Sequence, residues 1–405
     1  MPTLSPLGCT LVAAILVLAG LGSVIAREPS ARSVADDAKL RPSIIRVGPQ
    51  RQIKSIAQAA KMARPGDVVE IEAGDYLGDV AIWAQSDVVI RGVAGKPRIV
   101  ANGASAEGKG TFVVRANNVV IENLALIGSK VRDRNGSGIR LERGSVTVRG
   151  VSFAANEMAI LTSNDPTARL EVIDCDFEGD DSRDRQISHV LYTGNIDRLV
   201  VQGSYFRRGK IGHLIKSRAR QSYILYNRLS DETGTASYEA EFPAGGLAIV
   251  VGNLIQQSPH TDNPTIVSFG AEGYRWPRNE LHLVHNTIVN DRKEGGAWVA
   301  VRPGEAKARL VNNLFVGAGR FDVRAPHESV GNAFPKRSEF GNPDAFDYRL
   351  RIRSALAGAA TDPGEAGDLR LRPSRQYEHP AKSLPLPRAT PLTPLSPGAF
   401  QQLAP

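Results

Sequence analysis

The sequence contains very little cysteine, which excludes a fold held together by disulfides. Its 405 residues include 2 cysteines, Cys9 and Cys175, and Cys9 lies in an N-terminal segment that we expect to be removed. Small exported domains with poor cores depend on several disulfides. This chain must therefore be stabilised by packing, and Cys175, in the strand-like segment LEVIDCDF, is predicted to be a core residue.

Aromatic residues are also scarce, at 6% of the chain, whereas glycine is abundant, with 39 residues. Proteins that bind single-stranded nucleic acid stack the bases on aromatic side chains in a basic groove. The sequence has no such pattern, so we expect no nucleic-acid partner. A hydrophobic share of 42% and a charged share of 23% are typical of a folded protein, and the many glycines favour a turn-rich all-β chain.

One apolar run stands out at residues 11–25, and no Lys or Arg precedes it. The run is shorter than the ~20 apolar residues of a spanning helix, and Val24 and Ala26 suit signal-peptidase cleavage. We predict a signal peptide at 1–26, with an uncleaved anchor as the alternative, and a flexible segment at 27–43. The mature protein is then periplasmic or secreted, without stable membrane insertion.

The balance of charge is basic, with a formal net charge of +8 and a pI of about 9.5. A basic protein attracts anionic partners. For an exported protein we predict an anionic polysaccharide as the partner, bound by a monomer.

A short pattern recurs along the chain: three or four β-forming residues, then Asn, Gly or Asp, then another apolar stretch. Repetition of this kind is the signature of a solenoid, and each interval can hold three short strands and three turns. The recurrent residue suits a tight turn, and stacked Asn side chains can hydrogen-bond from coil to coil. We predict an all-β fold, a single-stranded right-handed parallel β-helix of about nine coils. The repeats end at Gly92, Asn123, Gly150, Asp174, Gly203, Asn227, Asn253, Asn286 and Asn313.

Both ends of such a solenoid need caps, because no coil buries its apolar face alone. Residues 53–63 have helical spacing and end at the sequence RPGD, which predicts an N-terminal capping helix. We place the β-helix at 44–350 and a Pro-rich tail, lying outside the solenoid or mobile, at 351–405.

The segment SIAQAAKMARPGDVVEIEAGDY, at residues 55–76, resembles the opening of pectin-lyase-like β-helix proteins, and the coils at 80–323 continue the resemblance. The resemblance implies that a second strand in each coil lines a substrate groove. Outward side chains of adjacent coils then form a ladder about 5 Å apart. It implies no one chemistry, since the superfamily holds lyases, hydrolases, epimerases and adhesins.

A polar cluster falls on this second strand. Basic residues gather at 207–220, and acidic residues follow at 229–242. Our alignment of the coils places Tyr192 and Glu239 beside Lys216, Glu241 beside Arg218, and His189 beside His213. A slip in register would reverse the orientation of these side chains.

The cluster suits β-elimination in a uronic-acid polymer. This reaction needs a positive group on the carboxylate, a base for the C5 proton and an acid for the leaving oxygen. We assign Lys216 as the base, Arg218 to the carboxylate, and Tyr238 or His213 as the proton donor. Further predicted substrate-binding residues are His189, Tyr192, Arg275 and Trp276, and predicted Ca²⁺ ligands are Glu239, Glu241 and Glu272.

Lys216-Ser217, Asn227 and Gly234-Thr235 are similar to the catalytic region of chondroitinase B and related alginate lyases, which implies a Lys base, a catalytic Arg on the next coil and acidic Ca²⁺ ligands. Residues 238–241 read YEAE where that family has Arg-His-Gly, so the resemblance supports the place of the groove and the role of Lys216. Two alternatives stay open: a non-catalytic polysaccharide-binding or envelope β-helix protein, and a glycoside hydrolase using Glu239 and Glu241.

Overall fold

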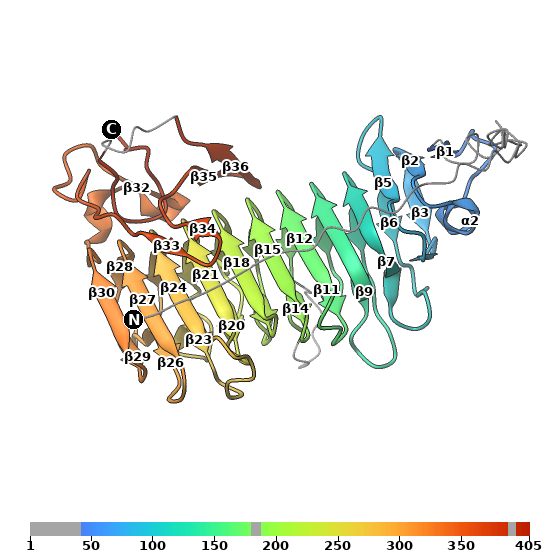
Figure 1. Ribbon diagram of the computed structural model, residues 1–405. Coiled ribbons are helices and arrows are strands. Elements are labelled where there is room, and N and C mark those ends of the chain that lie inside the picture. Colours follow the sequence, from blue (N-terminus) through green and yellow to red (C-terminus); the bar gives the residue numbers. More distant parts are fainter. Residues whose placement is uncertain (1–41, 180–187, 388–393) are drawn as a thin grey trace, which may run out of the picture. The chain divides into compact units, whose positions relative to one another are not determined.

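The strands of the large sheets run parallel, and successive coils stack one behind another (Figure 1). The computed structural model describes residues 42–179, 188–387 and 394–405. The predicted signal peptide, Cys9 and residues 27–41 of the predicted flexible segment lie outside these ranges. Alternate apolar residues turn inward along each strand and merge into one continuous core. The predicted parallel β-helix is confirmed.

Each coil contributes strands to three sheets. The first sheet, which carries the predicted groove, comprises β4 (Ala81–Trp83), β7 (Gly110–Glu122), β9 (Ser137–Arg149), β11 (Met158–Thr162), β14 (Leu191–Thr193), β17 (Ile215–Ser217), β20 (Ala240–Phe242), β23 (Thr265–Phe269), β26 (Ala297–Val301) and β29 (Arg320–Val323).

The second sheet carries most of the Asn and Gly turns at the ends of its strands. It comprises β1 (Ile44–Val47), β2 (Val68–Glu72), β5 (Val89–Val93), the second halves of β7 and β9, β12 (Arg169–Ile173), β15 (Arg198–Gln202), β18 (Gln221–Leu225), β21 (Leu247–Val251), β24 (Glu280–Val284), β27 (Lys307–Val311) and β30 (His327–Val330).

The third sheet has 10 strands in the described residues, close to the predicted coil number. They are β3 (Asp75–Leu77), β6 (Arg98–Val100), β8 (Ala125–Ile127), β10 (Ser152–Ala154), β13 (Asp176–Glu178), β16 (Tyr205–Arg207), β19 (Arg228–Ser230), β22 (Leu254–Gln257), β25 (Thr287–Asn290) and β28 (Leu314–Gly317).

A ladder of buried asparagines fixes the stacking of the later coils. The side-chain amide of Asn227 donates to Asn253 at 3.0 Å, Asn253 to Asn286 at 2.9 Å, and Asn286 to Asn313 at 3.0 Å. Each buried amide is thereby hydrogen-bonded to the next coil. A shift in register would leave these amides unpaired. The predicted hydrogen bonding of Asn turns from coil to coil is confirmed.

The N-terminal end of the solenoid is covered by helix α2 (Ile56–Met62), as predicted. Ser55 is its N-cap, and the carboxylate of Asp79 accepts hydrogen bonds from Ile56 N at 2.6 Å and Ala57 N at 2.9 Å. These contacts satisfy backbone donors that the first helical turn leaves free. Among the described residues, no helix is long and apolar enough to cross a membrane.

Segments after the solenoid cover two of its three outer faces. The last parallel strand ends at Val330, before the predicted end at 350, because the chain turns into antiparallel hairpins. These are β31 (Phe340–Asn342) with β32 (Asp347–Leu350), β33 (Glu365–Ala366) with β34 (Leu369–Arg370), and β35 (Arg375–Glu378) with β36 (Lys382–Pro385), besides the short 3-10 turns Arg337–Glu339 and Pro343–Ala345.

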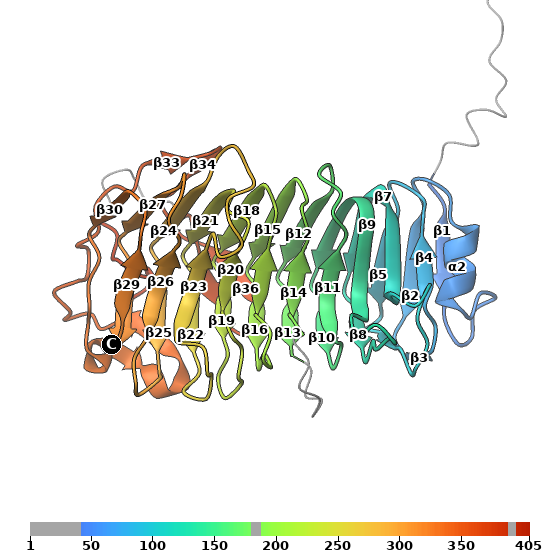
Figure 2. The ribbon, with the colours of Figure 1, turned by 90° about the horizontal axis from the view of Figure 1, so that it is seen from below.

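The covering segments lie over the second and third sheets (Figures 1 and 2). They pack on apolar outer side chains of these sheets. Ala366 and Leu371 belong to one hydrophobic cluster with Ile249 of β21, and Tyr348 belongs to another with Leu314 of β28. The outer face of the first sheet contributes to neither cluster. The fold therefore leaves the face with the predicted groove outside the hydrophobic packing of the C-terminal segments.

Candidate active site

Three stacked side chains form the centre of the candidate site on the outer face of the first sheet. Parallel pairing places Tyr192 of β14 opposite Lys216 of β17, and Lys216 opposite Glu241 of β20. Lys216 Nζ lies 3.3 Å from Glu241 Oε2 and 6.0 Å from the centre of the Tyr192 ring. The predicted Tyr192–Lys216 contact is confirmed, but the pairing of Lys216 with Glu239 is wrong by two residues.

Glu239 lies inside the solenoid instead of on the ladder. It is fully buried, and neither carboxylate oxygen has a hydrogen-bond partner among the described residues. Burial, followed by the charge of Asp231, raises the pKa of Glu239 well above its usual value. Burial thus favours the protonated form of this carboxyl group, and the group does not reach the outer face where Ca²⁺ or a substrate would bind.

The misplacement of Glu239 has a local cause. Alternation holds within a strand, but Leu214 and Ile215 are consecutive and both lie in the core. Leu214 immediately precedes β17, at a corner of the coil, and Glu239 occupies the equivalent corner before β20. Our alignment placed Glu239 opposite Lys216, where Glu241 lies, and so put this corner residue on the outer face of the strand.

Glu272 holds both basic side chains of the ladder. It lies in the loop 270–279 after β23, and its Oε1 is 3.1 Å from Lys216 Nζ and 2.5 Å from Arg218 Nη2. Arg218 Nε donates to Glu272 Oε2 at 2.7 Å, so the Arg–Glu contact is bidentate. The Arg218 contact, aided by Lys216 and opposed by burial, lowers the pKa of Glu272 to about 2. Arg218 was predicted beside Glu241, and Glu272 takes that place.

The Arg218 guanidinium lies 5.0 Å from the centre of the Tyr192 ring, within the range of a cation–π contact. Both cations therefore lie near the Tyr192 ring, and both form ion pairs with Glu272. Two cations on one aromatic ring, with a carboxylate between them, form a carboxylate-binding arrangement.

A cluster of rings adjoins the ladder. His213 lies between His189 and Tyr238, with ring centres 4.4 Å and 4.8 Å away. His189 Nδ1 accepts a hydrogen bond from the backbone N–H of His213 at 3.0 Å. Burial and the nearby charges of His213, Lys216 and Arg218 lower the pKa of His189 to about 2, so His189 stays neutral. The predicted juxtaposition of His189 and His213 is confirmed.

Glu241 links the rings to the ladder. Its Oε2 lies 3.0 Å from His213 Nε2, and its side chain is 5% exposed. Burial alone would raise the pKa of Glu241, but the contacts with His213 and Lys216 outweigh it and leave the pKa below the usual value. On the next coil Ser268 stands opposite Glu241. The sequence analysis did not select Ser268, although alternation along 265–269 placed it on the ladder.

Trp276 and Arg275, predicted to bind substrate, lie in the same loop as Glu272. The Trp276 indole N–H donates to the carbonyl oxygen of Arg218 at 3.1 Å, which fastens the loop to the ladder. The backbone N–H of Arg275 donates to Ala244, and its side chain is exposed with no polar contact to the described chain. Trp276 is thus a loop anchor, and Arg275 stands apart from the cluster.

The three predicted calcium ligands do not converge. Glu239 is inside the solenoid, and the ammonium of Lys216 lies between Glu241 and Glu272, where a cation shared by them would lie. The described residues include no group of three or more His, Cys, Asp or Glu with the geometry of a metal site. Ca²⁺ takes several converging oxygen ligands, and this donor set does not fit it.

These observations define a class: a parallel β-helix with the pectin-lyase-like fold, bearing a charged and aromatic cluster on its first sheet. Among solved structures it is similar to the crystal structure of pectate lyase Pel9A, with a TM-score of 0.50 and 11% sequence identity. The similarity covers 89% of this chain and 96% of that chain. At this identity it shows the fold alone. No family model and no curated protein matches the sequence.

Proposed function

We propose that this chain is a polysaccharide-active β-helix protein that cleaves an anionic, uronic-acid polysaccharide by β-elimination. The observation that carries the proposal is the pair of ion pairs that Lys216 and Arg218 form with the Glu272 carboxylate. A uronate carries the same chemical group. Glu272 is about a third exposed at its side chain, so it can swing out and leave its place to a sugar carboxylate.

In this proposal Lys216 and Arg218 neutralise the sugar carboxylate, which acidifies the neighbouring C5 proton. Lys216 faces two carboxylates, and both bind its ammonium form, so we assign it to charge neutralisation instead of the base role suggested by the sequence. Tyr238 is assigned to proton transfer, because this half-buried residue adjoins His213 and its hydroxyl makes no hydrogen bond within the described residues. His213 and Glu241 position Tyr238.

The atoms balance without a cofactor. The C5–H bond breaks and its electrons form a double bond between C4 and C5, while the C4–O4 bond breaks. In this proposal the deprotonated oxygen of Tyr238 takes the C5 proton and then delivers it to O4, which returns Tyr238 to its starting form. The products are an unsaturated uronate and a new chain end.

The test is incubation of the purified protein with alginate, pectate, chondroitin and heparan-type polymers while the ultraviolet absorbance of unsaturated uronate is followed. We expect the absorbance to rise on at least one polymer. The rate of this rise should be about 100-fold lower for Lys216→Ala and for Arg218→Ala. Glu294→Ala, an exposed position with no polar side-chain contact to the described chain, is the control. No product on any polymer would refute the proposal, as would full activity of Lys216→Ala.

A second candidate is polysaccharide binding without catalysis, favoured by the fact that Lys216 and Arg218 are already paired with carboxylates. Binding of a polymer with no absorbance change would establish it. A hydrolase is less well supported, because a paired-carboxylate mechanism needs one protonated acid. Glu241 and Glu272 both have lowered pKa values, and the protonated Glu239 lies inside.

Export to the periplasm or the medium belongs to the same proposal, since intact polysaccharides lie outside the cytoplasm. Its support is the apolar run at 11–25 with the small residues after it. N-terminal sequencing of the protein recovered from its native host tests it, and a mature chain beginning at Arg27 is expected.

A further inference from the structure

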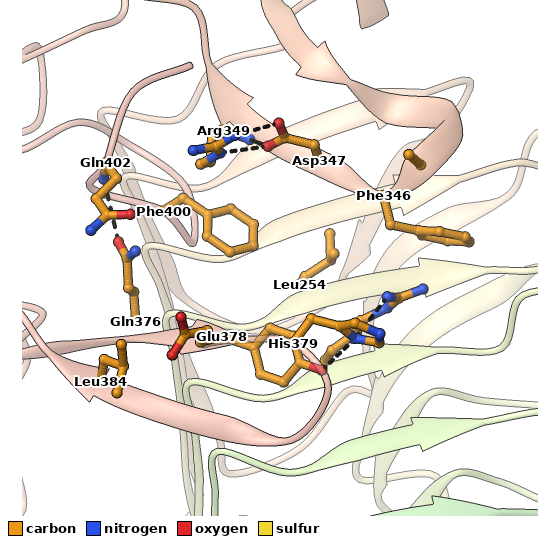
Figure 3. Close-up of a pocket in the computed structure, with 13 residues that line it drawn as sticks. Leu254, Phe346, Asp347, Arg349, Gln376, Glu378, His379, Leu384, Phe400 and Gln402 are labelled. Atoms are coloured by element: carbon orange, nitrogen blue, oxygen red, sulfur yellow. Dashed lines mark hydrogen bonds and ion pairs between the residues drawn. The ribbon is translucent and has the colours of Figure 1, made fainter. Parts of the chain in front are cut away.

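A cavity lies away from the ladder, between the C-terminal segments and the third sheet. Its volume is about 390 Å³, within the range of about 300–1,000 Å³ of small-molecule sites. Figure 3 shows it bounded by the β35–β36 hairpin on one side and by residues around Phe346 and Phe400 on the other. The ladder residues do not line it.

One wall of the cavity is apolar and rigid. Phe346, Phe400 and Leu254 contribute to it, and all three belong to the hydrophobic cluster that fastens the C-terminal segments. The Arg228 guanidinium lies 4.1 Å from the centre of the Phe346 ring and 4.6 Å from that of Tyr205. This stacking holds the Phe346 ring in place, so the wall is formed before any ligand arrives.

The opposite side offers polar groups that the protein leaves unused. Gln376 Oε1 accepts hydrogen bonds from the backbone N–H groups of Gln401 and Gln402, at 3.1 Å and 3.3 Å, which fixes the orientation of its amide. Its Nε2 has no hydrogen-bond partner among the described residues. The side chains of Glu378 and Gln402 line the cavity, are exposed and likewise have none within the described ranges. Figure 3 shows Gln376, Glu378 and Phe400 around the same space.

The ion pairs of the cavity leave one negative charge unpaired. Arg228 is paired with Glu232 at 3.3 Å, and Arg349 with Asp347 at 2.8 Å. Glu378 is then the lining charge with no ion-pair partner in the described chain. Such a site repels a uronate and accepts hydroxyl donors.

We propose that this cavity binds a neutral saccharide unit. A sugar ring has an apolar face that packs on Phe400 and Phe346, and its hydroxyl groups pair with the Gln376 amide, the Glu378 carboxylate and the Gln402 amide. The site is an accessory carbohydrate-binding site, independent of chemistry on the ladder, and it recognises a different class of sugar from the anionic polymer.

Saturation-transfer NMR and calorimetric titration of the full chain with glucose, galactose, mannose, maltose and cellobiose test the proposal, with galacturonate as the anionic comparison. We expect at least one neutral sugar to bind with a Kd on the order of 1 mM and galacturonate to bind elsewhere. Phe400→Ala is expected to weaken neutral-sugar binding at least about tenfold, a loss of about 1.4 kcal/mol.

Because Phe400 also packs in a hydrophobic cluster, the exposed double variant Glu378→Ala, Gln402→Ala provides a second arm. It should fold normally and lose the same binding. Lys216→Ala and the surface control Glu294→Ala should bind the neutral sugar as the wild type does. Loss of lyase activity leaves this result unaffected, so the two proposals fail separately.

Absence of binding by every neutral sugar would overturn the proposal. It is equally overturned if Lys216→Ala abolishes binding, or if the folded Glu378→Ala, Gln402→Ala variant retains it. Competition between galacturonate and the neutral sugar for one site would also contradict it, because the ladder and the cavity share no residue.

Discussion

The outer faces of the three sheets belong to the same coils but have opposite chemistry. On the second and third sheets the later strands turn apolar side chains outward, and the C-terminal segments bury them. On the first sheet the corresponding positions carry Tyr192, Lys216 and Glu241. In these coils, outward side chains under the C-terminal segments form a packed interface. Those on the face that these segments leave free form the polar cluster.

A similar contrast exists within one coil. Glu239 and Glu241 are separated by one residue, yet Glu239 is a neutral group of the interior and Glu241 an ionised member of the ladder. The difference comes from the corner before β20, since both residues have the same side chain. The position of a carboxylate relative to the corner thus determines its protonation state.

The largest effect is expected where the covered face receives a charge. Ile249 of β21 and Val120 of β7 lie in the same outward-facing row of the second sheet. Ile249 belongs to the hydrophobic cluster with the C-terminal segments, and Val120 does not. Ile249→Asp buries an unpaired carboxylate and should lower the free energy of unfolding by on the order of 3–5 kcal/mol. Val120→Asp, at a half-buried position, should cost less than about 1 kcal/mol. Urea denaturation measures both, and equal costs would show that the cover has no role.

The next effect concerns the buried carboxyl groups. Burial raises the pKa of Asp231 to about 7, and that of Glu239 is raised as well. Both hold a proton in the folded state at pH values where the unfolded chain releases it, above about 4. Their contributions to stability are thus full below about pH 4 and decline as pH rises, that of Asp231 through about 7, by on the order of a few kcal/mol.

Glu239→Gln replaces the protonated form with a neutral side chain of the same shape. The stability of this variant relative to the wild type should therefore increase as pH rises from 4 to 8. Denaturation curves at several pH values measure the difference in free energy of unfolding between the variant and the wild type. The contributions of all other titrating groups cancel in this difference. A difference that stays constant with pH would show that Glu239 is not a buried proton carrier.

The third effect compares the two glutamates in activity. Glu241→Gln removes the anion that joins His213 to Lys216 and should reduce kcat about 100-fold under the proposed function. Glu239→Gln should leave kcat within about twofold, because its side chain does not reach the outer face. Steady-state kinetics on the active polymer measure both variants. A folded but inactive Glu239→Gln protein would show that Glu239 takes part in catalysis.

The smallest effect is expected at the loop anchor. Trp276→Phe keeps an aromatic side chain but replaces the indole with a smaller ring and removes the hydrogen bond to the Arg218 carbonyl, which is worth about 0.5–1.5 kcal/mol. We expect a small fall in thermal stability and a rise in KM with little change in kcat, because Glu272 and Arg218 lose some of their order. An unchanged KM would show that the loop is held by its backbone hydrogen bonds alone.

The sequence by itself determined the solenoid. The spaced Asn and Gly turns, the alternation along strands and the helical spacing at 53–63 are local patterns, and each coil repeats them. Since each coil contacts only its neighbours, local patterns are sufficient to specify such a fold. They also located the cluster, because strands in consecutive coils must stack, and Tyr192, Lys216, His189 and His213 were placed together correctly.

Only the tertiary structure decided which carboxylates meet which cations. Corners between strands interrupt the alternation, so counting along the chain placed Glu239 where Glu241 lies. Glu272 reaches Arg218 through a loop whose path follows no period, and the cavity at Phe400 joins segments far apart in the chain. Periodic sequence determines contacts between coils, whereas loops and corners obey the packing of the whole molecule.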